Sequence, residues 1–290
     1  MSLDLKSVSR TFGRAASEYD QHAELQREVG GRLLERLDGL KFEPRSILDL
    51  GCGTGAQTLE LRQRFPDARI LAMDTAVAML GQAAKRRGWW RKRFDLAAGD
   101  ANALPLADTR FDLVLSNLML QWCNDVPAVL ANLRRVLKPG GMLLLSSFGL
   151  DTLRELRAAW ASVDAHPRVS RFTDVQRLGS ALTRSGFAEP VLDTDWITAT
   201  YQNPRDLLRE LKGIGASNAA SERCRGLTTP GRLKAMLEAY ESFRRPDRLY
   251  PATWEVLYAS AWAPDPGQPV RTDYGEEASI PVASLGIRRR

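Results

Sequence analysis

Glycines with the spacing of a ligand-binding turn follow the apolar run "SILDL" in the first part of the chain. Gly51, Gly53 and Gly55 stand directly after this run and before an amphipathic segment. Because glycine lacks a Cβ atom, such a turn lets the backbone approach a ligand closely. The spacing is G-x-G-x-G rather than the G-x-G-x-x-G of a dinucleotide site, which disfavours a pyrophosphate cradle. With Asp49 just before it, the turn predicts a site for a smaller ligand.

Two more acidic residues follow the next two candidate strands. Asp74 ends the second strand, where a carboxylate can accept hydrogen bonds from both hydroxyls of a ribose. Asp100 and Ala101 follow the third, and an acid there can accept from an adenine amino group. Since parallel strands bring their carboxyl ends to one edge, the set predicts a nucleoside site in the crevice above that edge. The alternative is that Asp49, Asp74 and Asp100 only cap turns, and it must explain why all three arrive in this order.

The elements that position these residues alternate between short apolar runs and helical patterns over 46–148. The pattern is typical of a parallel sheet flanked by helices. Strands are expected at 46–50, 69–74, 111–117 and 141–148, and amphipathic helices at 56–65, 76–86 and 126–137. The turn Lys138-Pro139-Gly140-Gly141 is expected to end the last of these helices.

Segments on either side of this sheet predict a helical cover. Residues 1–44 are helical in pattern and form a candidate lid, followed by a main domain at 45–263. Strands at 191–201 and 253–262 enclose a helical insertion at about 202–250. The tail, 264–290, is rich in Pro, Gly and charge without periodicity, and we expect it to be disordered.

Composition excludes several classes of protein. A net charge of +6 is a mild excess that does not indicate nucleic-acid binding by itself. No apolar run is long enough for a membrane span and the first residues lack a signal peptide, so we expect a cytoplasmic protein. Cys52, Cys123 and Cys224 are widely separated, which predicts reduced thiols and neither a disulfide nor a metal site.

The glycine turn, the acids and the sheet pattern together resemble the class I S-adenosylmethionine-dependent methyltransferases. The resemblance implies a Rossmann-like fold with a mostly parallel seven-stranded sheet and S-adenosylmethionine as cofactor. Carried over by position, it implies the following cofactor-binding residues: Asp49, Gly51, Gly53, Gly55, Asp74, Thr75, Met79, Asp100, Ala101 and Asn117.

Over residues 8–262 the chain also resembles the malonyl-acyl-carrier-protein O-methyltransferases of biotin synthesis. The resemblance rests on segments such as "FGRAASEYDQHAELQ", "SNLMLQWC", "HPRVSRF", "LKGIGASN" and "LYPATWEV". It implies methylation of the free carboxylate of a malonyl thioester, with malonyl-acyl carrier protein or malonyl-coenzyme A as substrate. Masking that charge lets fatty-acid elongation accept the chain as a biotin precursor.

Such a carboxylate is ionised at neutral pH, so the reaction needs placement rather than a general base. Tyr19 and Asn117 are expected near the reacting groups, and Arg171 and Lys212 are candidate cations for the malonyl carboxylate. Trp122 is either a packing aromatic or part of the site. Docking of the acidic carrier protein is expected to use the basic segment 85–93 or the arginines of 205–248.

The segment "LKGIGASN", 211–218, has glycines spaced as in a second phosphate-binding loop. No strand runs directly into it, so we interpret its glycines as a bend or hinge of a lid, with Lys212 facing the substrate. Alternative functions are a methyltransferase for another small carboxylate or a quinone precursor, and a methyltransferase-fold assembly factor or protein arginine hydroxylase. An RNA methyltransferase is disfavoured because no Asn-Pro-Pro-Tyr-like segment or RNA module is present.

Overall fold

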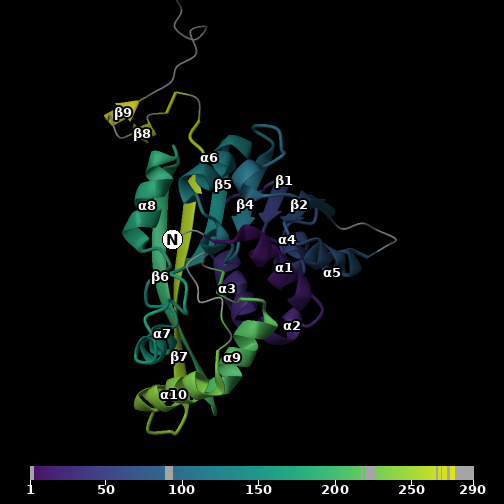
Figure 1. Cartoon of the computed structure of the whole chain (residues 1–290). Helices are drawn as coiled ribbons and strands as arrows, with labels where there is room; N and C mark the ends of the chain where they lie inside the picture. The colour runs from purple at the N-terminus through teal and green to yellow at the C-terminus, as the bar shows by residue number, and fades with distance from the viewer. Residues whose placement is uncertain are drawn as a thin grey trace, which may run out of the picture.

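A computed structural model describes the protein as a twisted sheet with helices on both faces (Figure 1). It describes residues 3–88, 94–216, 218–219, 226, 228–265, 267–268, 270–272 and 275–277. The tryptophans and cations of 89–93, Cys224 and most of the tail therefore lie outside the described residues.

Seven strands of the described chain form one sheet in the order β3-β2-β1-β4-β5-β7-β6. Strands β3, β2, β1, β4 and β5 are parallel, whereas β7 is antiparallel to both of its neighbours. The strand order reverses direction between β1 and β4, which places a ligand crevice at their carboxyl ends. The strands are β1 (Ser46–Leu50), β2 (Arg69–Asp74), β3 (Asp95–Ala98), β4 (Phe111–Ser116), β5 (Leu137–Phe148), β6 (Ala188–Tyr201) and β7 (Tyr250–Trp262).

Helices cover the two faces of this sheet because successive residues of each buried strand point to opposite sides. Ile47 and Leu113 pack on the face beneath α3, α4 and α5, and Leu48 and Val114 on the face beneath α6 and α8. These helices are α3 (Glu24–Glu35), α4 (Ala56–Arg64), α5 (Val77–Arg87), α6 (Val126–Val136) and α8 (Val175–Arg184).

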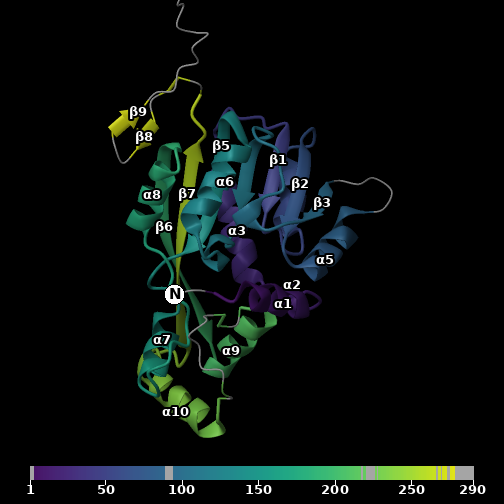
Figure 2. The ribbon, with the colours of Figure 1, turned by 45° about the horizontal axis from the view of Figure 1, so that its top comes forward.

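The N-terminal segment and the insertion meet beyond the carboxyl ends of the strands. Figure 2 shows α1 (Leu5–Ala15) and α2 (Tyr19–His22) between the sheet and α9 (Pro204–Gly213). The long strands β6 and β7 extend past the rest of the sheet and carry α9 and α10 (Pro230–Tyr240) between them. Helix α7 (Arg154–Ala161) packs against α10. Short 3-10 helices lie at Ala101–Ala103, Leu120–Trp122 and Glu241–Phe243.

The described residues 211–216 end α9 instead of forming a loop around a phosphate. Gly215 has φ of +74°, its N–H donates to Lys212, and the N–H of Ala216 donates to Leu211. This pair of hydrogen bonds is the Schellman arrangement that closes a helix C-terminus. A Cβ on Gly213 would lie 2.2 Å from the His22 ring, and one on Gly215 would lie 3.0 Å from the Thr11 carbonyl. Both glycines thus let the insertion pack closely on the N-terminal helices.

One local expectation was wrong. Helix α6 ends at Val136, and the strand expected to begin at 141 begins at Leu137. Lys138-Pro139-Gly140-Gly141 therefore belongs to β5 as an irregular stretch, in which Gly140 and Gly141 exchange hydrogen bonds with Ala263, just after β7. In the described part of the tail, β8 (Val270–Thr272) and β9 (Gly275–Glu277) form a short antiparallel pair.

Candidate active site

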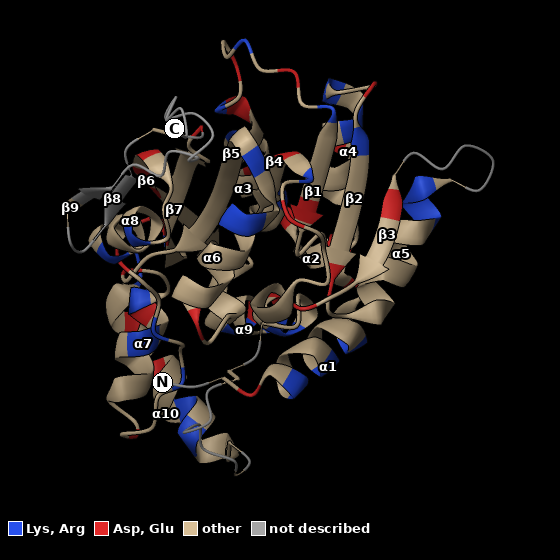
Figure 3. Ribbon diagram, turned by 90° about the horizontal axis from the view of Figure 1, so that it is seen from above, with Lys and Arg blue, Asp and Glu red and all other residues tan. Residues whose placement is uncertain are grey.

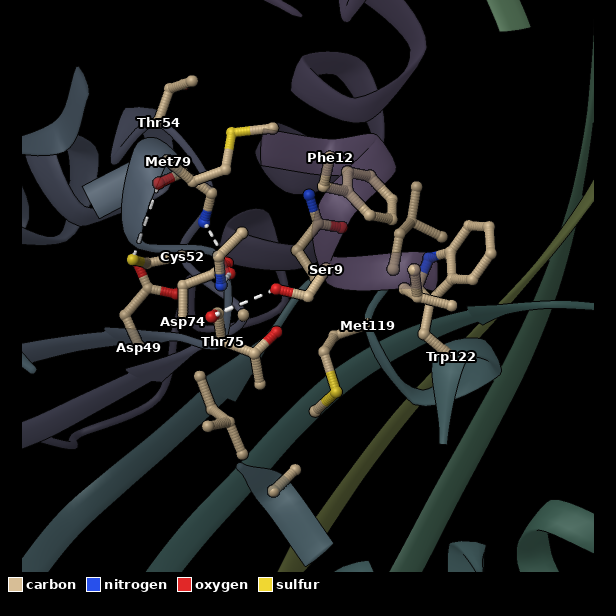
Figure 4. Close-up of a pocket in the computed structure, with 18 of the residues that line it drawn as sticks. Ser9, Phe12, Asp49, Cys52, Thr54, Asp74, Thr75, Met79, Met119 and Trp122 are labelled. Carbon is tan, nitrogen blue, oxygen red and sulfur yellow. Dashed lines mark hydrogen bonds between the residues drawn. The ribbon is translucent and has the colours of Figure 1, made fainter. Parts of the chain in front are cut away.

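The glycine turn is held against the end of β2 by backbone hydrogen bonds. The N–H groups of Gly51 and Cys52 donate to the Met73 carbonyl at 2.8 and 3.1 Å. The Asp74 carboxylate then accepts from the Gly53 N–H at 3.0 Å and from the Ala76 N–H at 2.8 Å. Asp74 therefore joins the turn to the start of α5 (Figure 4). Gly53 has φ of +54° and open space where a Cβ would project, as expected for a backbone that faces a ligand.

Gly55, the third glycine of the motif, lies outside the lining of the adjacent cavity. A Cβ there would lie 3.1 Å from the Cβ of Ala83. Its φ of +81° also favours glycine. Gly55 thus allows α4 to begin close against α5.

A cavity of about 570 Å³, here called the strand-end cavity, opens above the carboxyl edge of the sheet. Its volume lies in the ordinary range for a small-molecule site. Figure 4 shows Asp49, Asp74, Thr75 and Met79 around it. The expected cofactor-binding residues that line it are Asp49, Gly51, Gly53, Asp74, Thr75, Met79, Asp100, Ala101 and Asn117.

The three acids serve their own loops and also face the cavity, so the two interpretations of them are compatible. Asp100 accepts from the backbone N–H of Asn102 at 2.9 Å and from its side-chain amide at 2.8 Å. Asp49 is 1% exposed and accepts a hydrogen bond from the Thr58 hydroxyl. Burial is the main cause that raises the pKa of Asp49 to about 7; the Thr58 hydrogen bond opposes the rise and the nearby Asp74 adds to it. Burial likewise raises the pKa of Asp74, against the hydrogen bonds from the backbone.

The N-terminal helices close over the strand-end cavity. Ser9 donates to the Thr75 carbonyl at 3.3 Å, and Phe12 forms part of the lining. Asp20 accepts from the Thr54 hydroxyl at 2.7 Å and pairs with Arg86. This pairing fastens α2 to both the glycine turn and α5. The N-terminal segment thus covers the strand-end cavity at the edge of the sheet.

Tyr19 lies on this segment where the strand-end cavity meets a second one. The second, here called the inner cavity, has a volume of about 100 Å³. Burial raises the pKa of Tyr19, and the carboxylates of Asp74 and Asp20 raise it further. The phenol therefore keeps its proton at neutral pH, and its O–H is free to donate to a ligand. The residues shared by the two cavities are Phe12, Tyr19, Gln26, Leu118 and Trp122.

Asn117 and Trp122 come from the end of β4 and the short helix after it. The Asn117 amide donates to the Gln26 carbonyl at 2.9 Å and accepts from the Ser146 hydroxyl at 2.7 Å, which ties α3 to the sheet. Trp122 meets the Phe12 ring edge to face, with centroids 5.1 Å apart. Trp122 therefore packs against the N-terminal helix α1 and also lines the two cavities.

The two cations expected to bind the malonyl carboxylate, Arg171 and Lys212, line neither the strand-end cavity nor the inner cavity. Arg171 is exposed and lines a separate groove of about 1150 Å³, here called the arginine groove after Arg157, Arg168, Arg171 and Arg177. Lys212 is exposed and lines none of these three cavities. The helical period explains the second result, since Leu211 at the inner cavity leaves its neighbour Lys212 on another side of α9.

Three polar residues of the inner cavity were missed in the sequence. Within the described part of the chain, Oε1 of Gln26 and Nε1 of Trp254 are buried without a hydrogen-bond partner. Arg168 contributes a charge at the wall, where it pairs with Asp164 at 2.5 Å and lies over the Trp160 ring at 4.8 Å. Gln26, Arg168 and Trp254 all belong to segments of family resemblance, which was the available signal.

The fold and the strand-end cavity define a class I methyltransferase-type protein. The open backbone at Gly53 and the acids at successive strand ends fit a nucleoside cofactor such as S-adenosylmethionine. A family model described as "Methyltransferase domain" matches residues 48–145. The chain belongs to the family of malonyl-[acyl-carrier protein] O-methyltransferases, which its curated relatives show. It is 48% identical to that protein of Xylella fastidiosa, over 99% of this chain and 97% of the relative. It is 46% identical to that of Halorhodospira halophila, over 100% and 98%.

Solved structures support the fold at low sequence identity. A Haemonchus contortus phosphoethanolamine N-methyltransferase 2, in complex with S-adenosyl-L-methionine, is similar with a TM-score of 0.58 and 18% identity, over 87% of this chain and 57% of that one. The YcgJ protein of Bacillus subtilis is similar with a TM-score of 0.57 and 15% identity, over 82% and 99%.

Two features are absent from the described residues. No helix there is both long and apolar enough to cross a membrane. In the same part of the chain, no group of three or more His, Cys, Asp or Glu residues lies close enough together to hold a metal ion.

Proposed function

We propose that this protein transfers a methyl group from S-adenosylmethionine to the free carboxylate of malonyl-acyl carrier protein in the cytoplasm. The observation that carries the proposal is the small inner cavity next to the strand-end cavity, with Tyr19 and Trp122 common to both. Its volume of about 100 Å³ suits a short acyl group rather than a nucleobase with its sugar. The names of the relatives support the same acceptor.

The strand-end cavity is the proposed cofactor site. Asp74 and Asp100 would face the ribose and the adenine, while Met79 and Ala101 supply apolar lining. When bound, S-adenosylmethionine supplies an electrophilic methyl group on a positively charged sulfur. Burial raises the pKa values of Asp49 and Asp74, and a cationic sulfur bound nearby would favour their ionised forms.

The inner cavity is the proposed site of the malonyl carboxylate. One carboxylate oxygen would accept from the indole N–H of Trp254 and from the phenol of Tyr19, both neutral donors. Arg168, paired with Asp164 and stacked on Trp160, presents its guanidinium group at the wall. The other oxygen remains available to attack.

Methyl transfer at this place moves no proton. With S-adenosylmethionine bound, the carboxylate oxygen would accept the methyl group, and the carbon–sulfur electron pair would stay on the sulfur, which would become neutral. The contribution of the protein is to align the two groups and exclude water, effects that together can be worth about 7 to 11 kcal/mol. Phe12, Leu118 and Trp122 provide the dry, apolar surroundings. The methyl ester formed has lost the charge of the malonyl group.

The test is to incubate purified protein with labelled S-adenosylmethionine and each of malonyl-acyl carrier protein, malonyl-coenzyme A and free malonate. We expect a labelled methyl ester on the carrier-protein thioester. Label on free malonate alone would favour an acceptor other than a thioester, and label on none of the three would refute the proposal.

A substitution in the inner cavity sharpens the test. Trp254→Phe keeps an aromatic ring and removes the unpartnered N–H donor, so KM for the malonyl substrate should rise roughly tenfold, as for a lost hydrogen bond to a charge. Cofactor affinity should be unchanged. Trp196→Phe is the matched control, because Trp196 is 55% exposed and lines none of the three cavities.

A further inference from the structure

The arginine groove adjoins the inner cavity, and four residues line both. Residues of both linings include Gln121, Arg168, Val169 and Phe172. The groove is also much larger, at about 1150 Å³ against about 100 Å³. A ligand whose reacting end lies in the inner cavity can therefore extend into the groove.

Two of the four arginines of the groove form ion pairs, and two do not. Arg168 binds Asp164 at 2.5 Å, and Arg177 binds Asp174 at 3.2 Å. In contrast, no ion pair involves Arg157 or Arg171 within the described residues. The positive charges of Arg157 and Arg171 are therefore not balanced by a bonded acid of the described chain.

Arg157 is oriented by the backbone, which leaves part of its guanidinium unused. Its two terminal nitrogens donate to the carbonyls of Leu150 at 2.8 Å and Thr152 at 3.0 Å. Its Nε is buried without a hydrogen-bond partner in the described structure. Burial lowers the pKa of Arg157; Asp151 opposes this shift and the nearby Arg171 adds to it. Arg157 and Arg171 line the same groove. Two guanidinium groups on one groove, with a spare donor, are the arrangement that a phosphate oxygen stabilises. Figure 3 shows basic residues on α7, the helix that carries Arg157.

We propose that Arg157 and Arg171 bind the phosphodiester of the phosphopantetheine arm through which a carrier protein presents the malonyl thioester. This inference rests on the proposed function and extends it from the acyl group to its carrier. The malonyl end would lie in the inner cavity, and the arm would pass Gln121 and Phe172 into the groove.

The lining of the groove fits this arm in two respects. Leu120, Val126, Leu150 and Trp160 offer apolar surface to its methylene and gem-dimethyl groups. Arg171, which is exposed, offers charge to the phosphate at the open part. The assignment also gives Arg171 a role at the place where the structure puts it, outside the inner cavity.

The experiment compares substrates with and without the phosphate. Wild type and Arg171→Ala are assayed with malonyl-acyl carrier protein, malonyl-phosphopantetheine, malonyl-coenzyme A and malonyl-pantetheine. For the substrates that contain the phosphate, Arg171→Ala should raise KM about tenfold or more with kcat nearly unchanged, as for a lost charge-assisted hydrogen bond. For malonyl-pantetheine KM should change less than about twofold. Arg184→Ala is the control, since Arg184 is exposed on α8 and lines none of the three cavities.

Several results would overturn the inference. An equal rise in KM for malonyl-pantetheine would mean that Arg171 acts on the malonyl group or on folding. No rise for any substrate would remove Arg171 from binding, and a rise for malonyl-coenzyme A alone would remove the carrier protein as the source of the arm.

A binding measurement separates this inference from the proposed function. Calorimetric titration should detect phosphopantetheine binding to wild type, and neither pantetheine binding nor phosphopantetheine binding to Arg171→Ala. That result would support the phosphate site even if no malonyl substrate were methylated. Equal binding of pantetheine and phosphopantetheine would contradict it.

Discussion

Replacement of Asp49 by Asn should change the way in which stability depends on pH. Asp49 is 1% exposed, and its pKa in the folded protein is raised from 3.8 to about 7. In the unfolded chain an aspartate has a pKa of about 3.9. As pH rises, the unfolded state loses this proton first, so the folded state becomes less stable between about pH 4 and pH 7. The amide introduced by Asp49→Asn would stay neutral throughout, so the variant would not show this loss.

The magnitude follows from the shift of about three pH units, each worth 1.36 kcal/mol, which gives at most about 4 kcal/mol above pH 7. Between pH 5 and pH 8 the stability of Asp49→Asn relative to wild type should increase by roughly 2.5 kcal/mol. Urea unfolding without cofactor at several pH values measures it. Asp67→Asn is the control, because the Asp67 side chain is 84% exposed. Parallel curves for Asp49→Asn and wild type would refute the reasoning.

Three further predictions concern the cofactor site and the lid. Asp74→Ala removes the acceptor for two backbone N–H groups, so cofactor affinity should fall roughly tenfold or more by calorimetry, and unchanged affinity would contradict a nucleoside site. Gly213→Ala places a Cβ 2.2 Å from His22 and should cost about 1 to 3 kcal/mol in thermal unfolding. Gly231→Ala, with open space around it in α10, should be neutral or stabilising by up to about 1 kcal/mol, and an equal loss in both variants would contradict the contact. Asp20→Asn removes the charge that fastens α2, so amide exchange in α2 should accelerate while that in α8 stays the same.

The sheet was predictable because its signals are local. The strands at 46–50 and 69–74 match the structure residue for residue, since each is a short apolar run bounded by turn residues. Helices α9 and α10 lie between β6 and β7, where the insertion was predicted. The exact start of β5 was missed because it depends on non-local pairing: Leu137 pairs with Phe111 of β4, and Gly140 and Gly141 exchange hydrogen bonds with Ala263.

The sequence also predicted which segments line the strand-end cavity, but it did not predict the contacts of each residue. Gly51 and Gly53 reach the strand-end cavity as the motif indicates, whereas Gly55 packs on Ala83 of a helix that the motif does not include. Similarly, the spacing of "LKGIGASN" indicated a bend. Only the contacts of Gly213 with His22 and of Gly215 with α1 show that the bend serves packing of the insertion on the lid.

The sequence by itself determined the class of the protein, because a strand, a glycine turn and an acid at each strand end are adjacent along the chain. The acceptor side was decided only by the tertiary structure. Phe12, Trp122 and Trp254 lie more than 100 residues apart from one another, yet they line one inner cavity. Lys212 and Arg171 are plausible by charge alone, but helix orientation and loop path place them away from that cavity. Charge is a property of a residue, whereas the ligand that it faces depends on how distant elements pack.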